Sequence, residues 1–410
     1  MCHTSKADIY CVVMSLHLTD LLLAAVPIAW LLVSAISCFG VYWTQRGRDS
    51  FLPESGEPTV LIIPVHGVPP HLADLWRGIS RQSYRSLRVV FAVESSSDPA
   101  YAALHSLEGG PRREIVVAGM AARRGQKIHN LLAALGTLRD DDRVIVFADA
   151  DIVPCSDWMA RLVKWQKKDN KFDVVSGCRW MISDDERWAT AFVCVISSSF
   201  ATALRFRPFN IAWGGSIVIH RNAIAGLELK QLWDRAVSDD LTLTRSAWTH
   251  KGTVHRPRTG LVLSPVSYGW KDAIRFARRQ YILTRIHAPW HWALMAAITT
   301  LPLAGWIVAL PLALNGSIGA ISVIMVANIL DHMRAFFRRR VPKRLWNLDI
   351  PDRLARLDRW GTPLWLLVNA VVVWSTLTGR RITWAGRCYL LDGEGSVLRI
   401  DAACGSQYEE

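Results

Sequence analysis

The chain has 410 residues, of which 51% are apolar and 19 are tryptophan, so it can hold one large domain with additions or two domains. Its net charge of +13 suits an anionic partner, and the absence of a recognisable nucleic-acid module favours a membrane over nucleic acid. The eight cysteines form no C-x-x-C pair, which argues against a disulfide framework and a zinc site.

The N-terminal region, residues 1–48, contains an apolar run over 19–43 that is long enough to cross a bilayer. A cleaved signal peptide is the alternative, but this run is longer than a typical signal core. Arg46 and Arg48 follow it, and the positive-inside rule then places the next part of the chain in the cytoplasm. We therefore predict an uncleaved anchor, a multi-pass protein of the cell membrane and a cytoplasmic central domain.

The predicted soluble body, residues 57–287, alternates short apolar runs with helix-like segments. We predict strands over 59–65, 87–93, 114–118 and 143–149, and helices near 71–82, 99–107 and 126–138. This rhythm predicts an α/β fold with a parallel sheet and crossover helices, in which ligands bind at the carboxyl ends of the strands. The apolar segment 188–204 is broken by three serines, and we expect a helix that is buried or interfacial, not one that spans.

A membrane domain with about three further spans is predicted over residues 288–379. The spans are expected over 290–312, over 317–333 and, as a short last one, over 363–378. The basic stretch 334–344 marks a cytoplasmic segment, and the helix-like segment 352–360 is expected to lie on the membrane surface. With four spans in all, both termini lie on the far side of the membrane, and residues 380–410 form a tail.

The strongest functional signal is the pair Asp149 and Asp151, which comes directly after a predicted buried strand. Two carboxylates at such a place can hold a hard divalent cation, Mg²⁺ or Mn²⁺, and that cation can hold a diphosphate. A D-x-D is common, and a solvated loop is the alternative. The position at a strand end favours the metal site.

A second acidic pair, Asp239 and Asp240, follows Ser238 at a predicted helix start. Such carboxylates either cap the helix or act as a general base that takes a proton from an acceptor hydroxyl. The upstream D-x-D favours the base. We predict that Asp239 caps the helix, because it lies closer to the first free backbone N–H groups, and that the less tightly held Asp240 is the base.

Three weaker signals accompany the acidic pairs. Lys127 stands at a predicted helix start, a place that suits phosphate binding, although a solvated turn is the alternative. Arg278 and Arg279 stand just before the membrane, where they can stabilise a leaving diphosphate or contact anionic lipid. A turn in the body can bring backbone close to a ligand and offer an indole for stacking on a sugar: Trp213, Gly214 and Gly215.

These segments together resemble the membrane glycosyltransferases with a GT-A fold, glycosyltransferase family 2, and most closely the ceramide glucosyltransferase branch. The resemblance runs from about Thr59 to Ile400. The matching pieces are FAVESSSDPAY (91–101), GQKIHNL (125–131), FADADIVP (147–154), AWGGSIVIHRNAI (212–224), SDDLTLTR (238–245), the RRQY block (278–281) and RITWAGRCYLL (381–391).

The resemblance implies roles for four of the candidate residues. Lys127 would face the diphosphate of the donor, Asp149 and Asp151 would hold the divalent metal, and Asp240 would be the base. It also implies a nucleotide-sugar donor, expected to be a UDP-sugar, and a membrane lipid acceptor such as ceramide or another lipid alcohol. The expected reaction is an inverting transfer.

The sequence departs from the family pattern at two places. The family has an Asp near the end of the second strand that contacts the nucleotide; Ser95 stands there, and Glu94 or Asp98 is expected to substitute. The family's Q/R-x-x-R-W motif is altered as well, since Gln280 and Tyr281 stand where Arg-Trp is expected. A processive polysaccharide synthase and a catalytically degenerate membrane scaffold are the alternative functions.

Overall fold

A seven-stranded sheet with the order β3-β2-β1-β4-β7-β5-β8 forms the centre of the computed structural model, which describes residues 6–48, 51–166 and 172–401. Strands β1 to β4 run parallel, and β7 pairs antiparallel with β4. The strands are β1 (Thr59–Pro64), β2 (Leu87–Val93), β3 (Arg113–Val117), β4 (Val144–Ala148), β5 (Val174–Ser176), β7 (Ser216–His220) and β8 (Val254–His255). The predicted α/β class with a parallel sheet is confirmed.

Helices cover both faces of this sheet, because its strands are apolar on both sides. In β1, Leu61 and Ile63 pack into one core while Val60 and Ile62 pack into the other, and all four side chains are fully buried. The body's helices are α2 (Leu72–Ser80), α3 (Pro99–His105), α4 (Gln126–Leu135), α5 (Trp158–Val163), the 3-10 helix η1 (Arg207–Phe209), α7 (Asn222–Gly226), α8 (Leu229–Leu232) and α9 (Asp239–Thr249). A separate parallel pair consists of β6 (Cys178–Ser183) and β9 (Leu261–Val266).

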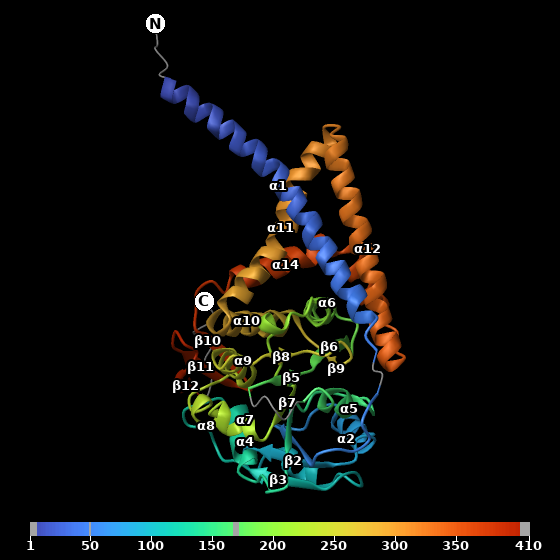
Figure 1. Ribbon diagram of the computed structural model, residues 1–410, viewed down its shortest axis with the longest axis vertical. Coiled ribbons are helices and arrows are strands. Elements are labelled where there is room, and N and C mark those ends of the chain that lie inside the picture. The colour runs from blue at the N-terminus through green and yellow to red at the C-terminus, as the bar shows by residue number, and fades with distance from the viewer. Residues whose placement is uncertain (1–5, 49–50, 167–171, 402–410) are drawn as a thin grey trace.

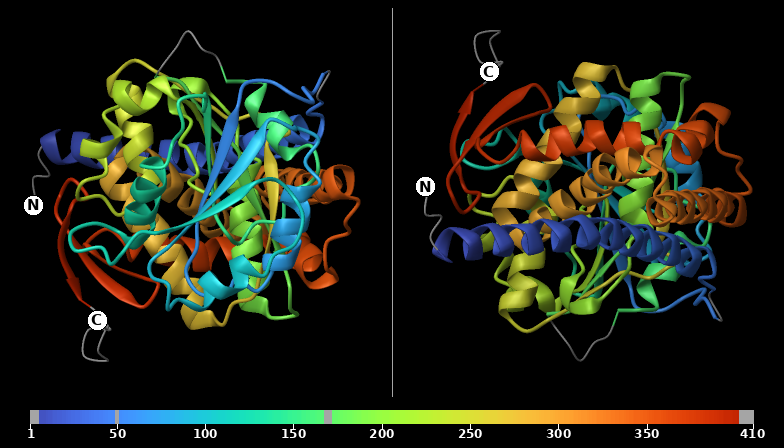
Figure 2. Two further views of the ribbon diagram at one scale, coloured as in Figure 1. Left: turned by 90° about the horizontal axis from the view of Figure 1, so that it is seen from below. Right: turned by 90° about the horizontal axis from the view of Figure 1, so that it is seen from above.

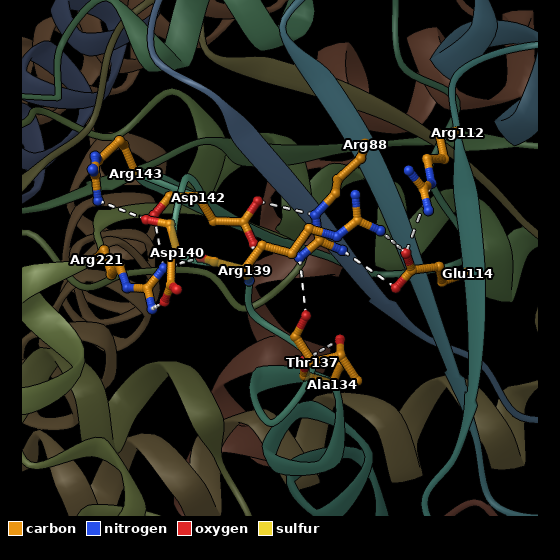
Figure 3. Close-up of polar contacts among 10 residues, drawn as sticks. All are labelled: Arg88, Arg112, Glu114, Ala134, Thr137, Arg139, Asp140, Asp142, Arg143 and Arg221. Carbon is orange, nitrogen blue, oxygen red and sulfur yellow. Dashed lines mark hydrogen bonds and ion pairs between the residues drawn. The ribbon is translucent and has the colours of Figure 1, made fainter.

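An ion-pair network closes the amino edge of the sheet, where the strands begin (Figure 3). Arg88 donates from Nε to Oδ1 of Asp142 over 2.9 Å, and Asp142 also accepts from the backbone N–H of Arg139. Glu114 pairs with both arginines. Burial alone would raise the pKa of Asp142, but the hydrogen bonds from Arg88 and Arg139 lower it. The charges at this edge therefore pair with one another, and the opposite, carboxyl edge carries the functional candidates.

Three helices in the described part of the chain are long and apolar enough to cross a membrane. They are α1 (Lys6–Gln45) from Ala25 onward, α11 (Pro289–Leu314) and α12 (Ile318–Trp346), and they rise together from one end of the body (Figure 1). Gly305 of α11 allows the close packing, because a Cβ there would lie 2.6 Å from the Trp30 ring of α1. The spans predicted over 19–43, 290–312 and 317–333 are confirmed as candidates.

The basic stretch 334–344 continues α12 and is not uniformly exposed. Arg334 and Arg338 are buried and pair with Asp331 and Asp358, so they connect α12 to the neighbouring helix α13 (Asp352–Trp360) and do not face solvent. The other basic residues of the stretch remain at the surface: Arg339, Arg340, Lys343 and Arg344.

The fourth span predicted over 363–378 is not formed. The helix there, α14 (Thr362–Trp374), has 13 residues and is therefore about 20 Å long, against a hydrocarbon core of about 30 Å. It runs across the base of the long helices, near α6 (Trp188–Ala201), α10 (Trp270–His287) and α13 (Asp352–Trp360) (Figure 1). Helix α6 matches the predicted non-spanning apolar helix. The span was already short in the sequence, and the helix that forms there is shorter still.

The segment after α14 returns to the body as a small antiparallel sheet of β10 (Arg381–Trp384), β11 (Arg387–Leu391) and β12 (Val397–Asp401) (Figure 2). Its inner face, with Ile382, Tyr389 and Leu391, packs on α9 and α10. The backbone N–H of Val397 donates to the carbonyl of Arg235 over 2.7 Å. Residues 381–401 of the tail therefore lie on the same side of the long helices as the body, opposite to the placement predicted from four spans. Cys388 of β11 is disulfide-bonded, although the cysteine spacing predicted no disulfide framework.

Cysteine labelling can test this topology. We expect Glu394→Cys in the C-terminal sheet and Glu108→Cys in the body, both at exposed positions, to react with an impermeant maleimide from the same side of sealed vesicles. The unmodified protein gives the background from native cysteines. Labelling of the two positions from opposite sides would show that α14 crosses the membrane.

Candidate active site

Three charged side chains meet at the carboxyl edge of the sheet around the ammonium group of Lys127. Lys127 lies in the first turn of α4, and its Nζ is 2.8 Å from Oδ1 of Asp149, directly after β4. It also lies 3.1 Å from Oδ1 of Asp239, the first residue of α9. One cation thus joins two carboxylates from distant segments, and the side chains of Lys127, Asp149 and Asp239 are only 12%, 24% and 4% exposed.

Burial and mutual charge set the protonation of this cluster. Burial alone would lower the pKa of Lys127, but the surrounding carboxylates raise it, so the ammonium stays charged. Burial raises the pKa of Asp239 to about 6 against the pull of Lys127, and the charges of Asp240 and Asp149 add to the rise. Burial would also raise the pKa of Asp149, but Lys127 and Arg179 lower it overall. At neutral pH both carboxylates of the cluster are therefore mainly anionic, and Asp149 is the more firmly ionised of the two.

The turn at Gly214 and Gly215 lies directly against this cluster. A Cβ on Gly214 would lie 2.5 Å from Oδ2 of Asp239 and 2.8 Å from Nζ of Lys127, and one on Gly215 would lie 2.6 Å from Oδ2 of Asp149. The turn is fixed at Trp213, because the backbone N–H of this residue donates to Oγ of Ser176 over 2.9 Å. The glycines are thus required for a close approach of backbone to the charged groups, which is the kind of role the sequence indicated.

The two carboxylates of the second acidic pair have the opposite surroundings to those predicted. Asp240, not Asp239, carries the local hydrogen bonds: it accepts from the backbone N–H of Gly214 over 2.9 Å, from that of Leu241 over 2.8 Å, and from the Ser238 hydroxyl over 2.5 Å. Ser238 is the N-cap. Asp239 turns inward to Lys127, and its Oδ2 is buried without a hydrogen-bond partner among the described residues. The predicted cap at Asp239 is wrong because burial against Lys127 overrides the local capping geometry.

Asp151 lies further out and pairs with Arg179 of β6. Its side chain is 51% exposed, whereas Arg179 is largely buried, also donates to the Ser264 hydroxyl over 2.9 Å and stacks on Trp213. Asp149 and Asp151 offer carboxylate oxygens at an open edge of the sheet, and such oxygens are the ligand type that a hard divalent cation prefers. No group of three or more potential ligands forms among residues 6–48, 51–166 and 172–401. A cation here would need diphosphate or water oxygens to complete its coordination.

The two substitutes predicted for the nucleotide-contacting Asp, Glu94 and Asp98, have different surroundings. Both oxygens of Asp98 are engaged by the N–H of Gly67, and Oδ1 also caps α3 at Ala100. Glu94 stands at the end of β2, where Oε1 pairs with Arg387 over 2.6 Å. Its Oε2 is buried and has no hydrogen-bond partner in the described part of the chain.

The four side chains of the RRQY block in α10 point in different directions. Arg279 faces the site, where its charge acts on Asp149 and Asp151. Arg278 turns away and donates to the carbonyl of Ser375 over 3.0 Å. Gln280 is exposed, and Tyr281 is buried against α14. Helical periodicity separates these neighbours, so the structure brings only Arg279 of the four to the carboxyl edge.

Sequence reasoning missed several residues that complete the site. Arg179 lies in β6, which carries no motif, and Tyr268 lies near it, with its pKa raised by burial. Trp384 and Arg387 belong to the segment RITWAGRCYLL, which was noticed only as a point of resemblance. Their return to the body after the membrane helices has no local signal in the sequence.

Comparisons with known proteins agree with this geometry. The sequence model of the family described as glycosyl transferase family 21 matches residues 26–397. A search of curated proteins returned no significant match. Together with the strand order of the sheet, the family match confirms the predicted GT-A type of α/β fold.

Solved structures show a distant similarity. One is the mannosyltransferase PcManGT from Pyrobaculum calidifontis in complex with GDP-Man and Mn²⁺, at 18% identity and a TM-score of 0.44, with 80% of this chain and 100% of that chain covered. Another is S. aureus TarS 1–349, at 13% identity and a TM-score of 0.34, with 82% of this chain and 97% of that chain covered. A third is S. aureus TarS, at 14% identity and a TM-score of 0.34, with 83% of this chain and 60% of that chain covered.

Proposed function

The chain belongs to glycosyl transferase family 21 and is a nucleotide-sugar glycosyltransferase, and on that premise we propose that it transfers a single sugar, with inversion, to the hydroxyl of a membrane lipid. The observation that carries the proposal is the Lys127 cluster, which places a buried cation and two carboxylates at the carboxyl edge of the sheet. Helix α10 adjoins that edge through Arg279 and leads directly into α11. The donor edge and the membrane are thus joined by one helix. The finer placement in the ceramide glucosyltransferase-like branch is part of this proposal.

The donor's diphosphate would lie between Lys127, Arg279 and a divalent cation held by Asp149 and Asp151. When bound, the cation would supply positive charge to the departing nucleoside diphosphate. Lys127 and Arg279 add fixed cations in a partly buried site, where electrostatic stabilisation is stronger than in water. We propose a UDP-sugar as the donor, in line with the family resemblance.

Asp240 would be the general base. It is half-buried at the same edge, whereas Asp239 is 3% exposed and faces Lys127. The oxygen of the acceptor hydroxyl attacks the anomeric carbon, the bond from that carbon to the diphosphate oxygen breaks, and the hydroxyl proton passes to Asp240. Direct displacement of this kind inverts the anomeric configuration.

The acceptor would arrive along a hollow at the membrane-facing side. A cavity of about 480 Å³ is lined by Trp188, Tyr268, Trp270 and Arg353, at the starts of α6, α10 and α13. The two tryptophans are about half-exposed, as is usual for indoles at a membrane interface. Tyr268 lies close enough to Arg179 and Asp151 for their charges to act on it. Tyr268 thus belongs both to the wall of this cavity and to the surroundings of the Asp151–Arg179 pair. The exposed basic end of α12 supports a cytoplasmic location for the body.

A donor panel tests the proposal. Full-length protein in membranes is incubated with labelled nucleotide-sugars, and the lipids are then extracted. We expect label in one lipid product, its loss in excess EDTA, and its return with Mn²⁺ or Mg²⁺. A labelled polymer would identify a processive synthase instead, full activity in EDTA would exclude the metal, and no transfer from any donor would contradict the proposal.

A further inference from the structure

The C-terminal sheet reaches the active site through the tip of one hairpin. Strands β10 and β11 pair up to Trp384 and Arg387, and the two residues between them, Ala385 and Gly386, have φ of 48° and 74°. Positive φ at both central positions is the signature of a tight hairpin turn that matches strand twist. The turn thus sets the indole of Trp384 and the guanidinium of Arg387 at the end of the hairpin.

Arg387 bridges two elements of the body at the donor edge. One nitrogen donates to Oε1 of Glu94 over 2.6 Å, after β2, and the other donates to Oε1 of Gln126 over 2.7 Å, at the start of α4. Gln126 is itself fixed, since its Nε2 donates to the carbonyl of Gly119 and to Asn130. The side chains of Arg387 and Glu94 are 18% and 16% exposed. This pair is therefore well shielded from solvent, and it orients the carboxylate of Glu94.

Trp384 supports the second cationic residue of the site. The guanidinium of Arg279 lies 5.1 Å from the Trp384 ring and 5.5 Å from that of Phe276. Both distances are within reach of cation–π attraction. Arg279 is thus held by two aromatic rings while its charge acts on Asp149 and Asp151.

We propose that this hairpin tip, Trp384 to Arg387, forms the outer wall of the donor site and that Trp384 and Arg387 are positioning residues for donor binding. Arg387 occupies one oxygen of Glu94 and leaves the buried, unpartnered Oε2 to accept from a nucleoside hydroxyl or base N–H. Trp384 holds Arg279 toward the diphosphate. This inference rests on the proposed function and adds that the segment beyond the last apolar helix builds part of the donor site.

Steady-state kinetics of the full-length protein in lipid nanodiscs test the inference. Loss of a charge-assisted hydrogen bond should raise the donor KM on the order of ten-fold in Arg387→Ala, with the acceptor KM unchanged. Binding of the free nucleoside diphosphate, measured by calorimetry, should weaken by a similar factor. Because Arg387 acts through Glu94, adding Arg387→Ala to Glu94→Gln should weaken donor binding little beyond Glu94→Gln alone.

The control is Arg399→Ala in the same sheet, where the arginine is 56% exposed and pairs with Asp401. It should leave both KM values unchanged. If Arg387→Ala lowers the melting temperature, the same KM comparison is made with Arg387→Gln, which keeps more of the side chain. A wild-type donor KM in a folded Arg387 variant, or an equal rise in both KM values, would overturn the inference. Failure of the unmodified protein to bind or use any nucleotide-sugar would instead overturn the proposed function.

Discussion

Replacement of Asp240 by Asn is expected to lower the rate of sugar transfer by roughly 10²–10⁴-fold, the usual effect of removing a general base. The Asp240 carboxylate accepts three hydrogen bonds, from Gly214, Ser238 and Leu241, and a carboxylate has about four acceptor sites. One site remains to take the acceptor's proton. Asp239 is an inferior candidate despite its raised pKa, because Lys127 and the backbone of Gly214 enclose it.

The measurement compares initial rates of lipid glycosylation, with nucleoside diphosphate binding determined separately. Asp240→Asn should bind the nucleotide like the unmodified protein and lose roughly 1–2 kcal/mol of stability, because an amide cannot accept from all three donors. Asp239→Asn is the matched variant and should retain more activity. If Asp239→Asn abolished transfer while Asp240→Asn remained active, the base would be Asp239.

The parallel part of the sheet could be predicted because its strands carry a strong local signal. Residues such as Val60 to Ile63 are apolar without interruption, as expected for strands buried on both faces. The D-x-D pair was recognisable because it follows such a strand. Lys127 and Asp239 could be selected one by one, since each stands at a helix start, and the edge of the sheet then brings them together.

The parts that could not be predicted depend on contacts between distant segments. The orientation of Asp239 is decided by Lys127, 112 residues earlier, and local capping rules contain no such information. The span predicted at α14 failed because apolar composition is shared by membrane helices and by helices packed under them. The hairpin with Trp384 and Arg387 reaches the donor edge only after the chain has left the membrane helices, so no pattern near β2 or α4 announces it.

Lys127→Met should impair both stability and donor binding, because Lys127 is the shared partner of two carboxylates. Removing one member of a buried ion pair costs roughly 3–5 kcal/mol, since the remaining charge stays buried and unpaired. The carboxylates left without their cation would be Asp149 and Asp239, whose side chains are 24% and 4% exposed. Asp240 lies close enough to Lys127 for its charge to act there as well. The substitution also removes the fixed cation proposed to face the diphosphate.

A second substitution separates the two effects. In Lys127→Met with Asp239→Asn, one of the two unpaired carboxylates is neutral, so part of the lost melting temperature should return. Donor binding should not return, because the cation is still missing. Lys230→Met, at an exposed position in α8, is the matched control and should behave like the unmodified protein in both measurements. If the double variant regained nucleotide binding along with its stability, Lys127 would be a structural ion-pair residue, and the diphosphate would have to be held by Arg279 and the metal alone.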